Sequence, residues 1–341
     1  MDIYERISDP VIKELVKRIH STPDAELPVL YAKIKLLWKC NLKCRFCSSD
    51  KGDVSLAAST VFSLLDQLKS AGTVKVHFSG GEVFLHPDIF RILEQAVSCG
   101  FQVNLTSNGT LLDKEKIKHL VAIGVHRITL SLDGAVASTH DAVRGVDGSY
   151  KKTVKSIRRI TEKGKKIRLG INTVACRANW HELDAIHNLL HSISPRIGWR
   201  VIPVDSMEKR MRLPFDAVAR LAEQAKRWKL LSGNPFGSNE QEYRMVTKGL
   251  YAKGFYRSHS CYMPWLHSFI DPAGNVFSCC MSRSTSEPLG NITTRRLTAI
   301  LGGGRSLKRK LYGAQGFPLR VCERCDDFIE ENLAVASVVD S

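Results

Sequence analysis

Residues 32–47 read AKIKLLWKCNLKCRFC, an apolar run followed at once by three cysteines. The apolar half has the composition of a buried β-strand. Cys40, Cys44 and Cys47 then fall within eight residues, in the loop that follows this strand. Thiolates are the usual protein ligands of iron–sulfur clusters, which commonly take four of them. Three thiolates leave one metal position open, as in a reactive metal site, whereas a structural zinc loop lacking one ligand is the alternative.

Five more strand-like runs follow, separated by amphipathic helical stretches. Strands that are buried on both faces appear as continuous apolar, β-branched runs. Strands that alternate with helices form right-handed βαβ units and a parallel sheet. We therefore predict an α/β fold built as a partial (β/α)6 TIM-like barrel, with a flat doubly wound sheet as the alternative. The six runs are AKIKLLW (32–38), VKVHFS (74–79), FQVNLTS (101–107), HRITLSL (126–132), IRLGINTV (167–174) and WRVIPV (199–204).

Several of the intervening helices have recognisable ends. Asp113 and Asn179 precede apolar-periodic stretches, and their side chains are suited to accept hydrogen bonds from the first N–H groups of a helix. Gly124 follows the first of these helices and is expected to end it. Pro87 suits the first turn of another helix, which should end at Gly100. One helix is expected to bury the face formed by Val61, Leu64, Leu65 and Leu68.

The chain of 341 residues is long enough for one large domain and a smaller one. Beyond residue 255 the texture changes to short β-like runs, turns such as DPAGN (271–275) and closely spaced cysteines. Such a small module has too little apolar core to fold without a bound metal. We predict an N-terminal extension (1–30), the (β/α)6 core (31–205), a helical bridge (206–254), a small cysteine-rich domain (255–328) and a C-terminal tail (329–341).

The cysteine content fits a reducing compartment. The chain starts with the acidic stretch MDIYERISDPVIKEL, which does not resemble a signal peptide, and it has no apolar run long enough to cross a bilayer. We therefore expect a cytoplasmic protein without a membrane partner. In the cytoplasm, ten cysteines favour metal or redox chemistry over disulfides. Cys99 and Cys176 stand apart from the spaced groups, in apolar surroundings, and are expected in the core.

The net charge of +16 favours an anionic partner. The basic residues are scattered over the outer faces of the predicted helices, and the two local clusters, at 163–168 and 305–310, contain no interleaved aromatic residues. Nucleic-acid sites usually combine basic grooves with aromatic stacking platforms. The pattern therefore argues against nucleic acid, and it favours a small-molecule, glycosylated or peptide substrate of anionic character.

The Cys40–Cys47 segment resembles the radical S-adenosylmethionine (SAM) superfamily, whose signature is C-x3-C-x2-C after the first barrel strand. Asn41 and Phe46 also match common members. The resemblance implies that the three cysteines hold a [4Fe–4S] cluster whose open iron binds SAM. An electron from an external reductant of the flavodoxin or ferredoxin type then cleaves SAM to a 5′-deoxyadenosyl radical, which abstracts hydrogen from an unactivated carbon. The difficult chemistry belongs to the cofactor, and the protein orients it.

Further motifs of this family follow in the expected order. Ser79-Gly80-Gly81-Glu82 after the second strand matches the GGE motif, which holds the methionyl amine of SAM. The resemblance implies SAM contacts from the later strand ends as well, because the carboxyl ends of parallel strands line the ligand site. Turn formation or surface exposure is the alternative for Asn108, Asp133 and Arg144. The implied cofactor-binding residues are Phe46, Ser79, Gly80, Gly81, Glu82, Asn108, Ser131, Asp133 and Arg144.

The later cysteines resemble the C-terminal SPASM/twitch extension of the same superfamily. Cys261 and Cys279 fit its C-x9–15-G-x4-C opening motif through Gly274, and Cys322 and Cys325 follow. Nothing comparable follows Cys325, so the resemblance implies the shorter twitch type, with these four cysteines on one auxiliary [4Fe–4S] cluster. A four-cysteine zinc site would need the same thiolates and is the alternative.

Cys280 is an extra thiol beside this set. If FSCC (277–280) continues a strand, Cys279 and Cys280 point to opposite faces, and only one of them joins the cluster. A free thiol facing the barrel mouth is suited to donate a hydrogen atom to a substrate radical, whereas a small buried hydrophobic residue is the alternative. We therefore predict an epimerase with Cys280 as the catalytic hydrogen donor, acting on a carbohydrate-type natural product.

Three other functions remain open from the sequence. One is a twitch-type dehydrogenase of a secondary alcohol in a sugar or aminocyclitol. Another is a SPASM peptide maturase, which the short N-terminal extension (1–30) disfavours, because it leaves no room for a fused precursor-binding domain. The third is a zinc- and nucleic-acid-binding protein without SAM chemistry, suggested by the basic charge and the CxxC pair.

Overall fold

The computed structural model describes residue 14 and residues 29–204, 209–231, 233–284, 286–303, 320–325 and 328–339. Most of the predicted N-terminal extension (1–30) and the basic cluster at 305–310 lie outside these residues. Along the described residues, no helix has both the length and the apolarity needed to cross a membrane.

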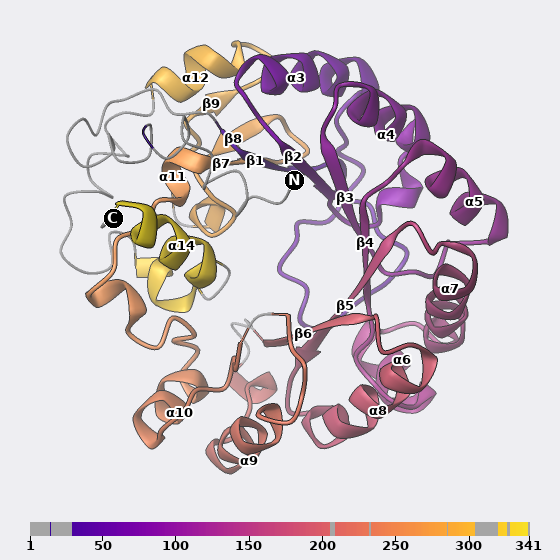
Figure 1. The fold of residues 1–341 in the computed structure, drawn as a ribbon, viewed down its shortest axis with the longest axis vertical. Coiled ribbons are helices and arrows are strands. Elements are labelled where there is room, and N and C mark those ends of the chain that lie inside the picture. The colour runs from indigo at the N-terminus through magenta and orange to yellow at the C-terminus, as the bar shows by residue number, and fades with distance from the viewer. Residues whose placement is uncertain are drawn as a thin grey trace.

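A nine-stranded sheet forms the centre of the described structure, with most helices on its outer side (Figure 1). The six predicted strands are all present, parallel and hydrogen-bonded in chain order. The sheet curves but does not close, so the predicted partial barrel is confirmed. The strands are β1 (Tyr31–Lys35), β2 (Lys75–Ser79), β3 (Gln102–Ser107), β4 (Arg127–Ser131), β5 (Arg168–Ala175) and β6 (Gly198–Pro203).

Three further strands extend the sheet beyond β1. Strand β7 (His267–Ile270) pairs with β1 in parallel, so the cysteine-rich region shares the sheet of the barrel. The other two strands, β8 (Asn275–Phe277) and β9 (Gly290–Asn291), add antiparallel pairs. As a result, β1 is an interior strand with a neighbour on each side.

Helices of the barrel follow the strands and cover the outer face of the sheet (Figure 1). Their apolar faces are buried, as predicted for Val61, Leu64, Leu65 and Leu68 of the first one. The barrel helices are α3 (Ala58–Ser70), α4 (Ile89–Ser98), α5 (Lys114–Ile123), α6 (Ala137–Arg144), α7 (Ser149–Lys163) and α8 (Leu183–Ile193), with the 3-10 turns η1 (Val83–Leu85) and η2 (Trp180–Glu182).

The remaining helices lie beyond β6. Helices α9 (Phe215–Ala225) and α10 (Glu240–Thr247) fall in the segment predicted to be a helical bridge. Helix α14 (Ile329–Val339) lies in the predicted C-terminal tail. The others are α11 (Met263–Leu266) and α12 (Leu297–Gly303), with the 3-10 turns η3 (Lys209–Met211), η4 (Phe255–Arg257), η5 (Ser282–Ser284) and η6 (Arg320–Arg324).

The predicted ends of α5 are confirmed. The Asp113 carboxylate accepts a hydrogen bond from the Lys116 amide at 2.8 Å. Gly124 ends the helix with a φ of 91°, a left-handed conformation that costs glycine little. Hydrogen bonding lowers the pKa of Asp113, first from the Lys116 side chain and then from its amide. The cap therefore carries its negative charge at neutral pH.

Two other predicted starts are wrong by a few residues. Helix α8 begins at Leu183 with Glu182 as its N-cap, because the Asn179 side chain is engaged elsewhere: it donates to the Asp133 and Val174 carbonyl oxygens and accepts from the Cys176 amide. Helix α4 begins at Ile89, two residues after Pro87. Of the two isolated cysteines, Cys176 is fully buried as expected, whereas Cys99, next to the end of α4, is only half-buried.

Candidate active site

The loops that carry the candidate residues meet at one edge of the sheet. Parallel strands place their carboxyl ends together, so the segments after β1, β2, β3 and β4 are neighbours. The first carries the three cysteines, and the others carry Gly81, Asn108 and Asp133. Hydrogen bonds between these segments confirm that they lie together.

The cysteine loop is held by the carboxyl end of α6. The Lys43 amide donates to the Arg144 carbonyl at 3.0 Å, and the Arg45 amide donates to the Val143 carbonyl at 3.2 Å. The Arg144 guanidinium also lies 3.6 Å from Cys44 Sγ. Any Cβ at Gly145 would overlap the Lys43 carbonyl oxygen, so glycine is needed where the helix meets the loop.

The two glycines of the GGE motif allow the loop after β2 to lie close to the loop after β1. The Gly81 amide donates to the Leu37 carbonyl at 2.7 Å, and the Glu82 amide donates to the Lys39 carbonyl at 2.9 Å. A Cβ on Gly81 would overlap the Lys39 carbonyl oxygen, and a Cβ on Gly80 would lie 2.5 Å from the Leu37 oxygen. These glycines therefore bring the second loop directly against the start of the cysteine loop.

Glu82 is fully buried beneath this contact. Its carboxylate accepts hydrogen bonds from the Asn108 amide at 2.7 Å, the Ser107 hydroxyl at 2.8 Å and the Phe84 amide at 3.2 Å. Burial raises the pKa of Glu82, while these three donors act in the opposite direction. A carboxylate can accept about four hydrogen bonds, so one acceptor position is left for a further donor.

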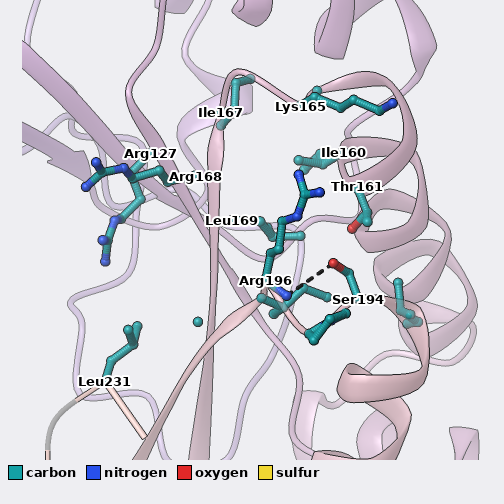
Figure 2. Close-up of a pocket in the computed structure, with 15 residues that line it drawn as sticks. Arg127, Ile160, Thr161, Lys165, Ile167, Arg168, Leu169, Ser194, Arg196 and Leu231 are labelled. Carbon is teal, nitrogen blue, oxygen red and sulfur yellow. Dashed lines mark hydrogen bonds between the residues drawn. The ribbon is translucent and has the colours of Figure 1, made fainter. Parts of the chain in front are cut away.

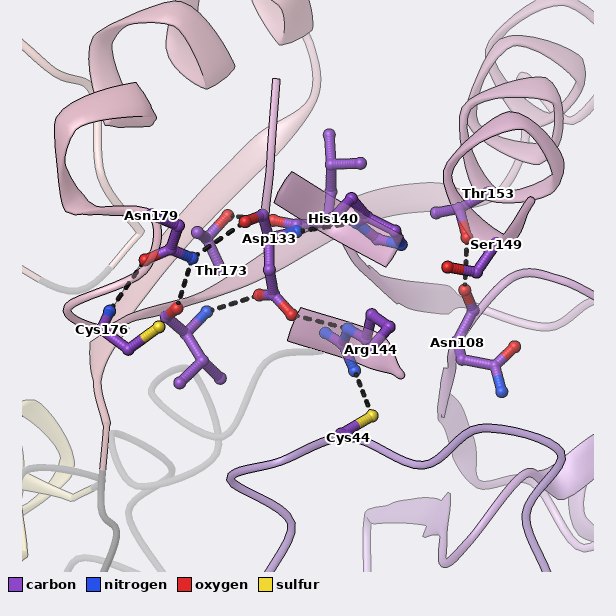
Figure 3. Close-up of polar contacts among 12 residues, drawn as sticks. Cys44, Asn108, Asp133, His140, Arg144, Ser149, Thr153, Thr173, Cys176 and Asn179 are labelled. Carbon is purple, nitrogen blue, oxygen red and sulfur yellow. Dashed lines mark hydrogen bonds and ion pairs between the residues drawn. The ribbon is translucent and has the colours of Figure 1, made fainter. Parts of the chain in front are cut away.

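Asn108 joins the third loop to the cysteine loop. Its side-chain nitrogen donates to Asn41 at 2.8 Å and lies 4.0 Å from Cys40 Sγ. The Thr153 hydroxyl on α7 donates to the Asn108 carbonyl at 2.9 Å and fixes the loop from behind (Figure 3). Thr153 was not expected from the sequence, because its helical periodicity assigns it only to a buried face.

Asp133 and Arg144 form a buried ion pair, with 2.6 Å between Asp133 Oδ2 and Arg144 Nε (Figure 3). The other Asp133 oxygen accepts from the Val174 amide at 2.8 Å. Burial raises the pKa of Asp133 against the effect of Arg144, and Asp133 raises the pKa of Arg144 against the effect of burial. Both predicted SAM contacts thus have partners within the protein, and the pair braces Cys44.

The surroundings of this ion pair are also buried and hydrogen-bonded. His140 Nδ1 accepts from the Asp133 amide at 3.1 Å, and burial followed by the Arg144 charge lowers the pKa of His140 to about 3. Phe46 lies 5.3 Å from the Arg144 guanidinium, on the cysteine side. Ser131 occupies the last position of β4 and is half-buried.

The three thiols of the first loop differ in acidity. Burial raises the pKa of Cys40 and of Cys44. For Cys47, burial acts in the same direction, but hydrogen bonding from the Ser49 amide and the charge of Lys51 outweigh it and lower the pKa. Cys47 is therefore the most acidic thiol of this loop in the metal-free protein.

The later cysteines are gathered around one apolar cluster. Cys261, Cys279, Cys322 and Cys325 belong to it or pack against it, together with Tyr256 and Trp265. Burial, then the charge of Cys279, raises the pKa of Cys261 to about 12. Asn332 of α14 is buried, donates toward Cys261 Sγ at 3.8 Å and accepts from the Tyr262 amide at 2.7 Å. Asn332 gave no signal in the sequence, since it lies in a helix of the predicted tail.

Cys279 and Cys280 do not lie on a strand. Strand β8 ends at Phe277, and Cys279 and Cys280 lie in the bend that follows, so the alternation of a strand does not set their directions. Cys280 packs against the same apolar cluster as the other late cysteines. Its charge also acts on Lys35 of β1, as does that of Cys47. Lys35 therefore lies within electrostatic reach of both cysteine groups.

Lys35 is a site residue that the sequence argument missed. Its Nζ donates to the Ser49 hydroxyl at 3.1 Å and lies 5.1 Å from the Trp38 ring and 5.8 Å from the Phe269 ring. Burial, then the charges of Lys33 and Arg283, lowers the pKa of Lys35 to about 8. Lysine at alternate positions 33 and 35 of a central strand was the available signal, since such strands are usually apolar.

The donor chemistry fits iron–sulfur clusters. None of these cysteines forms a disulfide, and three of them lie in one loop and four around the later apolar cluster. Within the described residues, no three ligating side chains converge on a point that a single ion would occupy. The ligands of a [4Fe–4S] cluster bind separate iron atoms and so surround a volume. The fit therefore rests on the number and type of the thiols.

Comparisons with known proteins agree with this arrangement. Residues 37–190 match the radical SAM superfamily, and residues 261–326 match the iron–sulfur cluster-binding domain SPASM. An AdoMet-dependent heme synthase of Nitratidesulfovibrio vulgaris is 29% identical over 168 residues, which cover 48% of this chain and 44% of that protein. A PqqA peptide cyclase of Bradyrhizobium diazoefficiens is 25% identical over 334 residues, which cover 92% and 82%.

A solved structure is similar over almost the whole chain. Streptococcus suis SuiB bound to S-adenosylmethionine superposes with a TM-score of 0.66 at 17% identity, covering 97% of this chain and 77% of that one. At this identity the likeness concerns the fold. The match to the heme synthase, in contrast, spans less than half of that relative's length. The chain belongs to the radical SAM superfamily, with a C-terminal SPASM domain, and its cofactors are SAM, a SAM-binding [4Fe–4S] cluster and an auxiliary cluster.

Proposed function

We propose that this chain is a radical SAM enzyme that modifies a peptide. The observation that carries the proposal is the length over which the relatives align with this chain. The alignment with the PqqA peptide cyclase runs through both domains, whereas the alignment with the heme synthase covers only about half of the chain. A peptide replaces the carbohydrate-type natural product that we expected from the sequence, because the carbohydrate had no support beyond the resemblance to twitch-type enzymes.

The residues of the site divide into ligands and supports. When bound, the first cluster and SAM supply a hydrogen-abstracting radical after one electron arrives from a reductant of the flavodoxin or ferredoxin type. We assign Cys40, Cys44 and Cys47 to this cluster. Glu82 has an acceptor position left for the SAM amine. Gly81 sets the approach of its loop to the cysteine loop, and Arg144, braced by Asp133, holds Cys44.

The auxiliary cluster belongs to the C-terminal region. We assign Cys261, Cys279, Cys322 and Cys325 to it, with Asn332 donating toward one sulfur. Hydrogen bonds to cluster sulfurs are among the features that tune reduction potentials. The proposed cluster lies in the module whose first strand pairs with β1, so the sheet itself joins the two metal sites.

Epimerisation is a second candidate reaction, favoured by the place of Cys280. The charges of this thiol and of Cys47 in the first cysteine loop both act on Lys35, so both sulfurs lie within electrostatic reach of the same side chain. In this reaction a hydrogen atom leaves one face of a substrate carbon, and Cys280 Sγ–H returns one to the other face. The sulfur radical left on Cys280 then takes one electron and one proton, the electron coming from the external reductant.

The first test is the metal content of the anaerobically purified and reconstituted protein. We expect about eight iron atoms per chain, four for each cluster, and 5′-deoxyadenosine after reduction with SAM. The Cys40→Ala variant should keep about four iron atoms and release no 5′-deoxyadenosine. A colourless protein that binds zinc would overturn the radical SAM assignment.

The second test uses the precursor peptide, identified by incubating the reduced enzyme with peptides encoded beside it. A product whose mass is unchanged in H2O and one unit higher in D2O indicates epimerisation, and a product two mass units lighter in H2O indicates a cross-link or dehydrogenation. If Cys280 is the donor, Cys280→Ala should abolish deuterium retention while SAM cleavage continues. The control is Cys99→Ala, which lies beside the end of α4. Normal inversion by Cys280→Ala would rule out the donor role.

A further inference from the structure

The inside of the barrel contains a cavity of about 590 Å³, within the usual range of ligand sites. It is lined by the inward-facing, alternate positions of the strands, such as Lys33 and Lys35 on β1 and His77 and Ser79 on β2. Phe328 and the first residues of α14 line it from the other side. A closed (β/α)8 barrel fills this space with layers of branched apolar side chains, so a polar cavity here requires an explanation.

The lining of the cavity is strongly cationic. Only Glu330 and Glu331, both on α14, carry negative charge among its described lining residues, whereas six lining residues are lysine or arginine. His77 is half-buried, and its ring nitrogens hydrogen-bond the Tyr31 and Thr106 hydroxyls. Desolvation, followed by the charges of Lys33 and Lys75, keeps the pKa of His77 well below the ordinary value, so it adds no positive charge. The six cationic residues are Lys33, Lys35, Lys75, Arg127, Arg168 and Arg200.

Lys33 and Lys35 occupy consecutive inward positions of the same strand. In the described part of the chain neither forms an ion pair with a carboxylate, and the polar partner of Lys35 is the neutral Ser49 hydroxyl. Two ammonium groups held close together within a half-buried cavity disfavour each other's charged state. A bound anion would remove this penalty, so the pair is arranged to receive one.

Two further groups lining the cavity are unsatisfied. Asn104 Oδ1 and Ser79 Oγ are buried and have no hydrogen-bond partner among the described residues, and the two side chains are 5% and 8% exposed. A buried polar atom without a partner costs about 1–3 kcal/mol, which a ligand can recover. Asn104 Oδ1 only accepts, so it requires a donor such as a peptide N–H. Anionic groups and N–H donors together are the chemistry of an acidic peptide.

The cationic lining continues to the opposite edge of the sheet. A second cavity of about 640 Å³ lies at the amino ends of β4, β5 and β6, and it shares Arg127, Arg168 and Leu231 with the first. Figure 2 shows Arg127 and Arg168 side by side on one flank of this cavity, with Lys165 and Arg196 on the helix side. The cationic side chains therefore continue from the inside of the barrel past the amino ends of these strands, towards α7 and α8 and away from the cysteine loop.

We propose that the barrel interior binds an acidic segment of the peptide substrate, with Lys33 and Lys35 on its carboxylates and Asn104 on a backbone N–H. The identification of the ligand as a peptide rests on the proposed function. The site for carboxylates, in contrast, is argued from the residues that line the cavity. The carboxylates lie along β1 below the first cluster, and the residue that reacts lies at the cysteine loop above them.

The test measures binding to the reconstituted, SAM-loaded protein by fluorescence anisotropy. The probes are the end-blocked, labelled peptides (Glu-Gly)3 and (Gln-Gly)3, which differ only in charge. At about 50 mM salt we expect the acidic peptide to bind roughly tenfold more tightly, a difference that added salt reduces. The preference should disappear in the Lys33→Gln/Lys35→Gln double variant and return in Lys33→Arg/Lys35→Arg. Equal binding of the two peptides by the native protein would overturn the proposal.

The control is Lys152→Gln/Lys155→Gln, which removes two exposed charges from the outer face of α7 and should keep the preference. If the double variant of β1 fails to fold, as judged by iron content and circular dichroism, Arg168→Gln provides the second measurement and should weaken the preference. An unchanged preference in the β1 variant would place the peptide elsewhere and reject the cavity.

Citrate, as a competitor and as a direct ligand, separates the two parts of the proposal. Displacement of the acidic peptide by citrate in the native protein supports one shared carboxylate site. Binding of citrate that depends on Lys33 and Lys35, without binding of either peptide, supports the carboxylate site and overturns the peptide as its occupant. Failure of the proposed function has a different readout, namely the absence of a modified peptide while the acidic probe still binds.

Discussion

Gly81 shows how a single position controls the candidate site. It lies where the loop after β2 passes under the start of the cysteine loop, and its amide bonds the Leu37 carbonyl at 2.7 Å. Its neighbour Glu82 is held by the same contact and is fully buried. The absence of one Cβ therefore sets the relation between the proposed SAM amine site and the proposed cluster.

Changing Gly81→Ala should displace the cysteine loop, because the new Cβ would overlap backbone rather than a flexible side chain. We expect the reconstituted variant to hold about four iron atoms instead of about eight, with the auxiliary cluster retained. Gly302→Ala is the matched control, since its Cβ would meet nothing within 4 Å. Full iron content and normal SAM cleavage in Gly81→Ala would contradict this explanation.

The Asp133–Arg144 pair is a second effect at the residue scale. Replacing Asp133→Asn leaves the Arg144 guanidinium buried without its counter-charge, which typically costs about 3–5 kcal/mol. We expect a clearly lower melting temperature and loss of the first cluster, because Arg144 also holds Cys44. Asp216→Asn on the exposed side of α9 should change neither quantity. A stable Asp133→Asn variant with both clusters would show that the pair has no supporting role.

At the scale of secondary-structure elements, helices α6 and α7 contact and position the loops that form the candidate site. Helix α6 ends in Gly145 against the cysteine loop, and α7 donates from Thr153 to the loop after β3. Helix α5, in contrast, has a self-contained start: the Asp113 side chain bonds the Lys116 amide. This makes α5 a suitable element for testing a local effect without disturbing the metal sites.

We expect Asp113→Ala to destabilise α5 by about 1 kcal/mol, and Asp113→Asn to cost less, because asparagine also caps helices well. Hydrogen exchange of the α5 amides in the intact holoenzyme measures this locally. The pKa of Asp113 is lowered in the folded protein, so its contribution is complete above the ordinary carboxyl pKa of 3.8 and is lost as the pH falls through the lower, folded value. Faster exchange spread over the whole sheet would argue against a local cap.

At the scale of the whole molecule, the SPASM region and the barrel share one sheet. Strand β7 pairs with β1 from Tyr31↔His267 to Ile34↔Ile270, and Ile270 belongs to the same core as Ile34. The edge of β1 that faces β7 would otherwise present unpaired N–H and C=O groups and an uncovered apolar flank. The two domains are therefore continuous in structure.

A chain that ends at residue 254 should consequently be insoluble, because it exposes the edge of β1, and exposed edges pair with other chains. We expect it in the pellet under conditions that keep the full chain in solution, and sedimentation after expression measures this. The control carries Cys261→Ala and Cys279→Ala in the full chain, which should reduce the iron content while leaving β7 in place. A soluble truncated chain with about four iron atoms would contradict the shared-sheet argument.

How much of the fold and of the candidate site was predictable depends on how far apart in the sequence the contacting residues lie. The six strands, the helical face of α3 and the Asp113 cap follow from periodicity and neighbouring residues, and the structure confirms them. The predicted role of Asn179 as a helix cap was wrong because its side chain binds the carbonyl oxygens of Asp133, in the loop after β4, and of Val174 on β5, and no local pattern reveals these contacts. The pairing of β7 with β1 joins positions more than two hundred residues apart and had no local signal.

The sequence by itself determined the type of fold and the chemistry of the site, because strand periodicity and cysteine spacing are local properties of the chain. Only the tertiary structure decided which groups face one another. It places Asp133 against Arg144, and it places Lys33 and Lys35 in the lining of one cavity. The physical reason is that charge pairing, burial and orphaned hydrogen-bonding groups depend on distances in space, which the sheet sets only when its strands assemble.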